Sequence, residues 1–265
     1  MKRLFPALAA IVLLASCASG GGASPSTKAS VSPPTAAAAT ASATAVPSTT
    51  PAPTPVPTVG GCPNREEGIF NTCLGYVPEG TYQTTTFHPP LAYALPAGWG
   101  NLEDLPGNFL LLPVDATLAG VDAGTSDYLG VYASVAAAGH CTGKPSTTVP
   151  QTWQGLVDWL TSDPALNVTN LKAVTVSGLQ GDVMDIAMKN LQGDGCSDGA
   201  YADVYVGVGR SSLVHSVGPN IPLRIYLLKH GADTLAIEIQ DAPGGYYRDW
   251  PTTAAGVVAK LQIAP

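Results

Sequence analysis

The chain has 265 residues, 12% of them charged, and a formal net charge of −7. All 19 acidic residues lie beyond residue 61, whereas Lys2, Arg3 and Lys28 precede it, so residues 62–265 carry nine Lys and Arg and a formal charge of −10. A surface this acidic argues against binding to nucleic acid and against direct adhesion to anionic lipid.

The first 17 residues have the pattern of a bacterial lipoprotein signal peptide. A basic start is followed by an apolar run at residues 7–14 that is too short to span a bilayer. The run ends in Leu14-Ala15-Ser16-Cys17, which matches the lipobox and implies that Cys17 is diacylated and becomes the mature N-terminus. Two acyl chains would hold the protein stably at the membrane, outside the cytoplasm. The alternative is an ordinary secretory cleavage site in which Cys17 is incidental.

Residues 18–61 consist mainly of Ala, Ser, Thr, Pro and Gly, with Lys28 as the only charge and with no aromatic residue. This composition cannot bury a core and predicts a disordered linker. At the polyproline II rise per residue, its 44 residues reach at most roughly 130 Å. We interpret it as an O-glycosylated stalk through an envelope layer or, alternatively, as a passive spacer.

Residues 62–265 are long enough for a single domain with one sizeable core. Their four cysteines are an even number in an exported chain, which predicts disulfides. Of the three pairings we favour Cys62–Cys73, which brackets a short loop, with Cys141–Cys196, which connects loops on either side of the central unit. A zinc site is the alternative, but the sequence contains no CxxC spacing.

The central unit is a helix followed by a hairpin. Helical spacing of apolar residues occurs at Trp153, Leu156, Val157, Trp159 and Leu160, and Asp163-Pro164 ends the helix. Alternating strands are then expected at 173–177 and 182–188, joined by a glycine turn at 178–181. We expect the apolar stripe of the helix to cover one face of the sheet.

Further strands are expected on both sides of this unit, at residues 81–87, 91–95, 109–114, 128–136, 204–206, 223–229 and 234–240. A last helix is expected to bury Ala254, Val257, Val258 and Leu261. The predicted fold class is α+β, a twisted antiparallel sheet with two main helices packed on it.

The motifs that carry a family resemblance are FHPPLAYALPAGW at 87–99, Leu156–Leu160 with Asp163-Pro164, VTVSGLQG at 174–181 and RIYLL at 224–228. In this order they resemble a group of uncharacterised actinobacterial and Chloroflexi-type extracytoplasmic proteins. That group is similar to the PsbP-like fold, which includes mycobacterial lipoproteins of the LpqN type. The resemblance covers about residues 82–265. It implies a binding or assembly factor without catalytic residues.

The sequence lacks the common motifs of catalytic and metal-binding sites. The sequence has no G-x-S-x-G, and Ser211 and His215 share a face of a strand merely by its period, so we interpret them as a partly exposed strand end. The four histidines, His88, His140, His215 and His230, have no metal-binding spacing and are expected in loops. No catalytic residue and no cofactor is predicted.

The segment Asp194–Gly199 superficially resembles a calcium loop, but Cys196 stands at its third ligand position and Tyr205 at its twelfth, where a bidentate Glu is required. An acidic loop around a disulfide explains it better, and no metal site is predicted.

A cluster of aromatic residues before the last helix is the candidate binding surface: Tyr246, Tyr247, Arg248 and Trp250. Such side chains stack on sugars or anchor protein partners. The alternative is that Trp250 and one tyrosine seal the helix onto the sheet.

We therefore expect a membrane-tethered, non-catalytic binding or assembly module of the cell envelope. Its partners would be the membrane, through the lipid anchor, and an envelope protein or glycan. The alternative is a cell-envelope hydrolase whose acid-based or Ser-His site is assembled from distant residues.

Overall fold

The computed structural model describes residues 66–67, 73–113, 120, 125–189, 196, 200–209, 213–243 and 249–265. All of them belong to one compact unit, Pro53–Pro265. The predictions for Cys17, for the linker at 18–61 and for Cys62 lie outside the described residues. Within the described residues, no helix has both the length and the apolar character needed to cross a membrane.

The described strands form three sheets, and every pairing between them is antiparallel. The large sheet has nine strands in the order β1 (Glu66–Glu67), β2 (Cys73–Val77), β5 (Trp99–Asp104), β6 (Asn108–Pro113), β7 (Tyr128–Tyr132), β14 (Asp233–Gln240), β13 (Leu223–His230), β10 (Leu179–Met188) and β9 (Leu166–Val176). The β11 sheet contains β12 (Val214–Val217), β11 (Ala202–Gly207) and β8 (Val135–Ala137). The β4 sheet contains β15 (Gln262–Ile263), β4 (Leu91–Leu95) and β3 (Gly80–Gln83).

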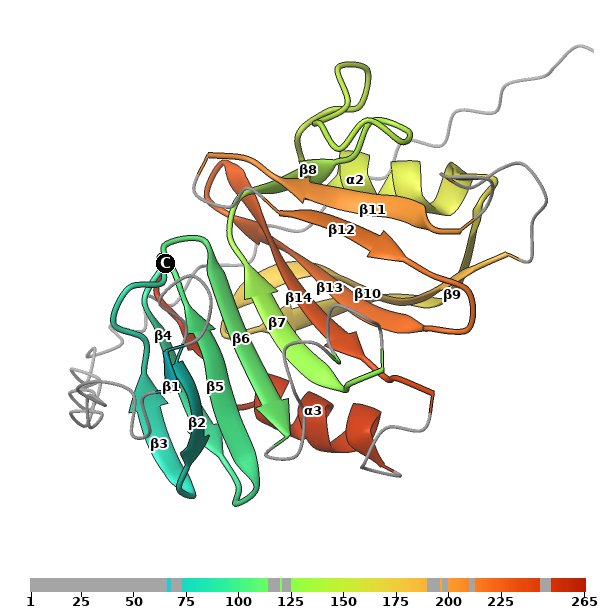
Figure 1. Ribbon diagram of the computed structural model, residues 1–265. Helices are drawn as coiled ribbons and strands as arrows, with labels where there is room; N and C mark the ends of the chain where they lie inside the picture. Colours follow the sequence, from blue (N-terminus) through green and yellow to red (C-terminus); the bar gives the residue numbers. More distant parts are fainter. Residues whose placement is uncertain are drawn as a thin grey trace, which may run out of the picture. The chain divides into compact units, whose positions relative to one another are not determined.

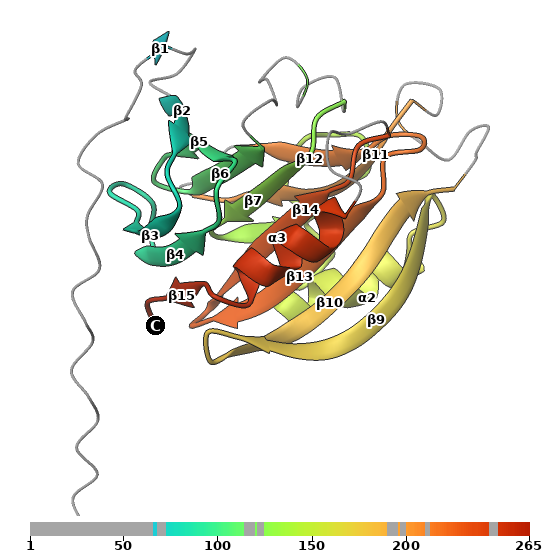
Figure 2. The same ribbon diagram turned by 90° about the horizontal axis from the view of Figure 1, so that it is seen from below.

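Both faces of the large sheet are covered (Figure 1 and Figure 2). Helix α2 (Trp153–Ser162) and the β11 sheet share one core cluster with Ile225 and Leu227 of β13. Helix α3 (Trp250–Val258) and the β4 sheet share the other cluster with Tyr226 and Leu228. Because successive side chains of a strand point to opposite faces, β13 is apolar at four successive positions, Ile225–Leu228. The predicted α+β class is therefore observed, but as three sheets where we expected one.

Helix α2 begins and ends as its sequence predicts. The hydroxyl of Thr152 accepts a hydrogen bond from the backbone N–H of Gly155 at 3.1 Å, which caps the first turn. Asp163 is extended, with ψ of 122°, as a residue before proline prefers. The helix packs on β8, β9, β13 and β14, so the expectation that its apolar stripe covers a sheet face is confirmed.

Several predicted boundaries are wrong. The turn between β9 and β10 consists of Ser177 and Gly178 alone, with φ of +52° and +80°, and β9 begins at Leu166, well before the predicted start. The strand expected at 128–136 breaks at Ser134, with φ of +54°, and its two parts enter different sheets. The strand expected at 81–87 ends at Gln83. Strands β1, β2, β5 and β15 were not predicted.

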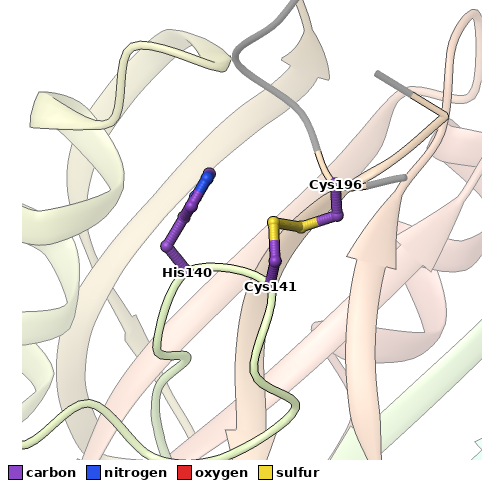
Figure 3. Close-up of side chains that lie close together, drawn as sticks. All are labelled: His140, Cys141 and Cys196. Atoms are coloured by element: carbon purple, nitrogen blue, oxygen red, sulfur yellow. A yellow bond between two sulfur atoms is a disulfide. The ribbon is translucent and has the colours of Figure 1, made fainter. Parts of the chain in front are cut away.

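The predicted disulfide between Cys141 and Cys196 is present, with an S–S distance of 2.07 Å (Figure 3). It ties the loop after β8 to the segment before β11, across a sequence separation of 55 residues. On the chain-entropy model a loop of this length contributes about 4 kcal/mol to the free energy of unfolding. The bond fits an oxidising compartment. The pairing of Cys62 with Cys73 lies outside the described side chains.

Trp250 is a core residue and not an exposed aromatic anchor. Its side chain is 1% exposed, and its ring centroid lies 4.7 Å from that of Trp99 in β5. It opens α3, whose buried residues also include Ala254, Val257 and Val258, as the predicted apolar stripe requires. Trp250 therefore seals α3 onto the sheet, which is the alternative that the sequence left open.

Replacing Trp250 with alanine should destabilise the fold, because the side chain belongs to the core and not to a binding surface. Loss of a fully buried tryptophan is expected to lower the free energy of unfolding by about 3–5 kcal/mol, because a cavity opens against Trp99. Urea unfolding measures this, and Trp250→Phe should lose less. A loss in Trp250→Ala below about 1 kcal/mol, at an unchanged m-value, would contradict the packing described here.

Candidate functional site

A partly polar hollow lies where β9 and β10 meet β13. We call it the bulge pocket. It has a volume of about 310 Å³, close to the lower limit for small-molecule sites. It is lined by Asn170, Leu171, Lys172, Val183, Met184, Asp185, Arg224 and Tyr226.

A β-bulge in strand β9 forms one wall of this pocket. Lys172 pairs with Val183 and Thr169 pairs with Asp185, so Asn170 and Leu171 together oppose the single residue between those partners. Asn170 has φ of +54°, in the left-handed region that Asn tolerates better than most residues. A regular strand would turn alternate residues to opposite faces, but the bulge lets three consecutive residues line one hollow.

The pocket is lined by an ion pair between Arg224 and Asp185. Arg224 donates from Nε to Oδ1 of Asp185 at 2.7 Å and from Nη2 to Oδ2 at 3.1 Å, and Nδ2 of Asn170 donates to the same Oδ2 at 2.7 Å. Burial raises the pKa of Asp185, but hydrogen bonds from Arg224 and Asn170 and the charges of Arg224 and Lys172 outweigh it, so that the pKa is lowered. The guanidinium is therefore fixed in one orientation by an ionised partner.

A second hollow, the Asp241 pocket, adjoins the same ion pair. It has a volume of about 220 Å³ and is lined by Asp185, Pro222, Leu223, Arg224, Ile239, Asp241 and Pro251. Burial raises the pKa of Asp241. Two carboxyl groups whose pKa values move in opposite directions thus line one hollow, and Arg224 with Asp185 separates it from the bulge pocket.

A buried polar cluster between the large sheet and the β11 sheet contains the most strongly perturbed groups. The carboxylate of Glu238, 1% exposed, accepts hydrogen bonds from the hydroxyls of Tyr128 and Tyr205, and Nδ1 of His215 lies 3.4 Å from it. Burial raises the pKa of Glu238, but the charge and hydrogen bond of His215 and the two tyrosine donors outweigh it and lower the pKa. At most 8% of any of these residues is exposed, so the cluster joins two layers and is closed to a ligand.

A further hollow of about 360 Å³ brings two histidines, a serine and an aspartate together: its lining includes His88, Ser134, His230 and Asp233. The hydroxyl of Ser134 donates to Oδ2 of Asp233 at 3.1 Å, and Nε2 of His230 lies 2.9 Å from the carbonyl oxygen of Ala264. A catalytic triad needs a histidine hydrogen-bonded to the serine, but the hydroxyl of Ser134 donates directly to Asp233 and His230 contacts a backbone carbonyl instead, so these residues do not have the arrangement of a triad.

The candidate residues chosen from the sequence fall into two groups. Tyr246, Tyr247, Arg248 and Ser211 lie outside the described residues. His215 lies in strand β12, as the interpretation as a strand end requires, but it is only 8% exposed and is buried beside Glu238, so the expected partial exposure is wrong. His230 belongs to β13 and His215 to β12, so the expectation of loop positions is wrong for these two histidines.

The only group of possible metal ligands found among the described residues contains His140, Cys141 and Cys196. Both sulfur atoms are bonded to each other (Figure 3), and a disulfide sulfur cannot supply the thiolate that a metal needs. The disulfide also occupies the third position of the calcium-like segment. The other five residues of that segment lie outside the described residues.

No protein-family model matches the chain, and no curated protein matches it. A crystal structure from Bacteroides thetaiotaomicron is similar to it at 10% identity and a TM-score of 0.32; the match covers 66% of this chain but only 45% of that one. The solution structure of cyanobacterial PsbP (CyanoP) from Synechocystis is similar at 10% identity and a TM-score of 0.34, over 78% of this chain and 99% of that one.

The pKa shifts in the buried cluster predict how stability depends on pH. Burial, and next the charge of Glu238, raise the pKa values of Tyr128, Tyr132 and Tyr205 well above 10. An unfolded chain releases these protons near pH 10, so stability is fully present below that pH and is lost as pH rises, by up to about 1.4 kcal/mol per pH unit for each tyrosine.

Tyr128→Phe tests this cluster. Removing the hydroxyl leaves Oε1 of Glu238 without its donor and should lower the free energy of unfolding at neutral pH by about 1.5–3 kcal/mol. The same variant should lose stability less steeply above about pH 10, because one raised pKa is gone. Urea unfolding across the pH range measures both effects, with Tyr201→Phe as the control. An alkaline profile identical to that of the wild type would contradict the prediction.

Proposed function

We propose that this chain is a lipid-anchored, extracytoplasmic binding module without catalytic activity, and that its ligand occupies the bulge pocket. The observation that carries the proposal is the guanidinium of Arg224, held by Asp185 at the junction of two open hollows. A positioned donor fork in a partly apolar hollow is typical of a recognition site. The lipobox at Cys17 and the disulfide between Cys141 and Cys196 support the extracytoplasmic location.

The hydrogen bonding of Asp185 favours binding over catalysis. Its two oxygens already accept from Arg224 and Asn170, and its lowered pKa makes it a weak base. An arginine stays protonated at any physiological pH and cannot act as a general acid. The groups at the centre of the site are therefore suited to orienting a ligand and not to transferring protons.

The PsbP-like, LpqN-type relationship suggested by the sequence belongs to this proposal. It supports an assembly or carrier role, in which the domain would offer the pocket to an envelope protein or glycan at the distance from the membrane that the linker allows. The membrane itself would be contacted through the acyl chains on Cys17.

The hydrolase alternative keeps one observation in its favour. In the Asp241 pocket, Asp241 has a raised pKa and Asp185 a lowered one, which is how paired acids divide the roles of proton donor and base. Turnover of a glycan or ester by the purified protein, abolished in Asp241→Asn, would favour this alternative over the binding proposal.

A substitution at Leu171 tests the binding proposal. This side chain lines the bulge pocket and is 46% exposed, so Leu171→Asp should preserve the fold while placing a charge on the apolar wall. Leu213→Asp is the matched control, because Leu213 is 40% exposed and does not line the pocket. Saturation-transfer NMR against a panel of small neutral, anionic and cationic compounds should detect ligands whose binding weakens about tenfold in Leu171→Asp only. A panel without one such compound would overturn the proposal.

Anchoring at Cys17 is tested separately. Cys17→Ser removes the thiol that would be acylated, so the protein should appear in the medium or remain unprocessed, whereas Ser19→Ala should behave as the wild type. Membrane fractionation and mass spectrometry of the N-terminal peptide measure the outcome. A correctly processed Cys17→Ser protein in an unchanged membrane fraction would rule out the lipid anchor.

A further inference from the structure

Arg224 has hydrogen-bonding capacity that the described fold does not use. A guanidinium carries five N–H donors, and Asp185 takes one from Nε and one from Nη2. The three others, including both on Nη1, have no partner among the residues that the structure describes. The side chain is 36% exposed. The edge formed by Nη1 and Nη2 is a second fork with the spacing of a carboxylate.

The charges around the bulge pocket favour an anion. Its lining contains Arg224 and Lys172 against a single acid, Asp185, so the hollow carries one net positive charge on a unit that is otherwise strongly acidic. Asp241 lies in the adjoining pocket and would repel an anion from that side. An anionic group is therefore expected on the β9 side of Arg224, between its guanidinium and the ammonium of Lys172.

Apart from Asn170, the rest of the wall is apolar. The side chains of Leu171, Val183 and Tyr226 supply it, whereas that of Met184 points into the core on the α2 side of the sheet, and the volume of about 310 Å³ leaves room for one ring or a short chain. A compact, strongly hydrated anion such as phosphate would leave these walls unused, because apolar surface contributes to binding only when a ligand covers it.

We propose that the bulge pocket binds a monocarboxylate carried on a small apolar group, with Arg224 as the bidentate anchor and Lys172 as the second positive charge. This assignment rests on the proposed binding function and adds the class of ligand. The carboxylate belongs either to a free organic acid or to the C-terminus of a peptide with an apolar last residue, since both present the same chemistry to the pocket.

Phenylacetate and phenylacetamide are the probes, because they share one apolar group and differ in charge. Titrated into the full-length protein and followed by NMR, phenylacetate should bind about tenfold more tightly than the amide. Arg224→Gln should abolish that difference, and Arg224→Lys should reduce it, because an ammonium keeps the charge but loses the fork. Lys172→Gln should weaken the binding of phenylacetate but not that of phenylacetamide. Lys189→Gln, which lies outside the pocket, should change the binding of neither probe.

The outcomes separate this inference from the proposed function. If the acid and the amide bind equally and Leu171→Asp weakens both, the pocket is a binding site but the preference for an anion is overturned. Inorganic phosphate binding as tightly as phenylacetate would overturn the requirement for an apolar group. Failure of both probes to bind at millimolar concentration would overturn the inference. N-acetylleucine and an acetylated peptide ending in leucine then distinguish the two sources, and if Arg224→Gln fails to fold, Lys172→Gln and Arg224→Lys retain the test.

Discussion

The ionised side chain of Glu238 is the constraint on which the arrangement of the layers depends. Taking a carboxylate out of water costs several kcal/mol, and the cost is offset only when donors surround it. Its donors come from β7 of the large sheet and from β11 and β12 of the β11 sheet. Because the charge is paired only when these strands of two sheets lie together, the cluster favours one packing of the two sheets.

On the opposite face, the limited width of one helix creates the site. An α-helix is about 10 Å across and neighbouring strands lie about 4.8 Å apart, so a single helix covers about two strands. Helix α3 packs on β14 and β4, and β10 and β9 extend beyond it (Figure 2). The polar side chains of this uncovered part, among them Asp185 and Arg224, can therefore stay partly solvated, and a bulge there can hollow the surface without opening the core.

The sequence predicts what depends on local periodicity. Helix α2, strand β4 and the hairpin of β13 and β14 follow from apolar spacing and turn residues, and the strands run close to the expected positions. It does not predict the bulge. Asn170 and Leu171 interrupt the alternation of apolar and polar residues in β9, so the part of the strand before them is not recognised as a strand. Nor does it predict the ion pair, since Asp185 and Arg224 meet only through the register of β10 with β13. Glu238 and His215 likewise look like ordinary strand residues until two sheets enclose them.

The same ion pair that orients Arg224 also limits how strongly the site can bind. Asp185 neutralises much of the guanidinium charge, so an incoming carboxylate gains less Coulomb energy than it would from a free arginine. In return the fork is already ordered, and little side-chain entropy is lost on binding. Lys172 then decides the net charge of the hollow. A site built in this way selects a ligand by shape and charge and still releases it, which suits the binding or assembly role proposed above.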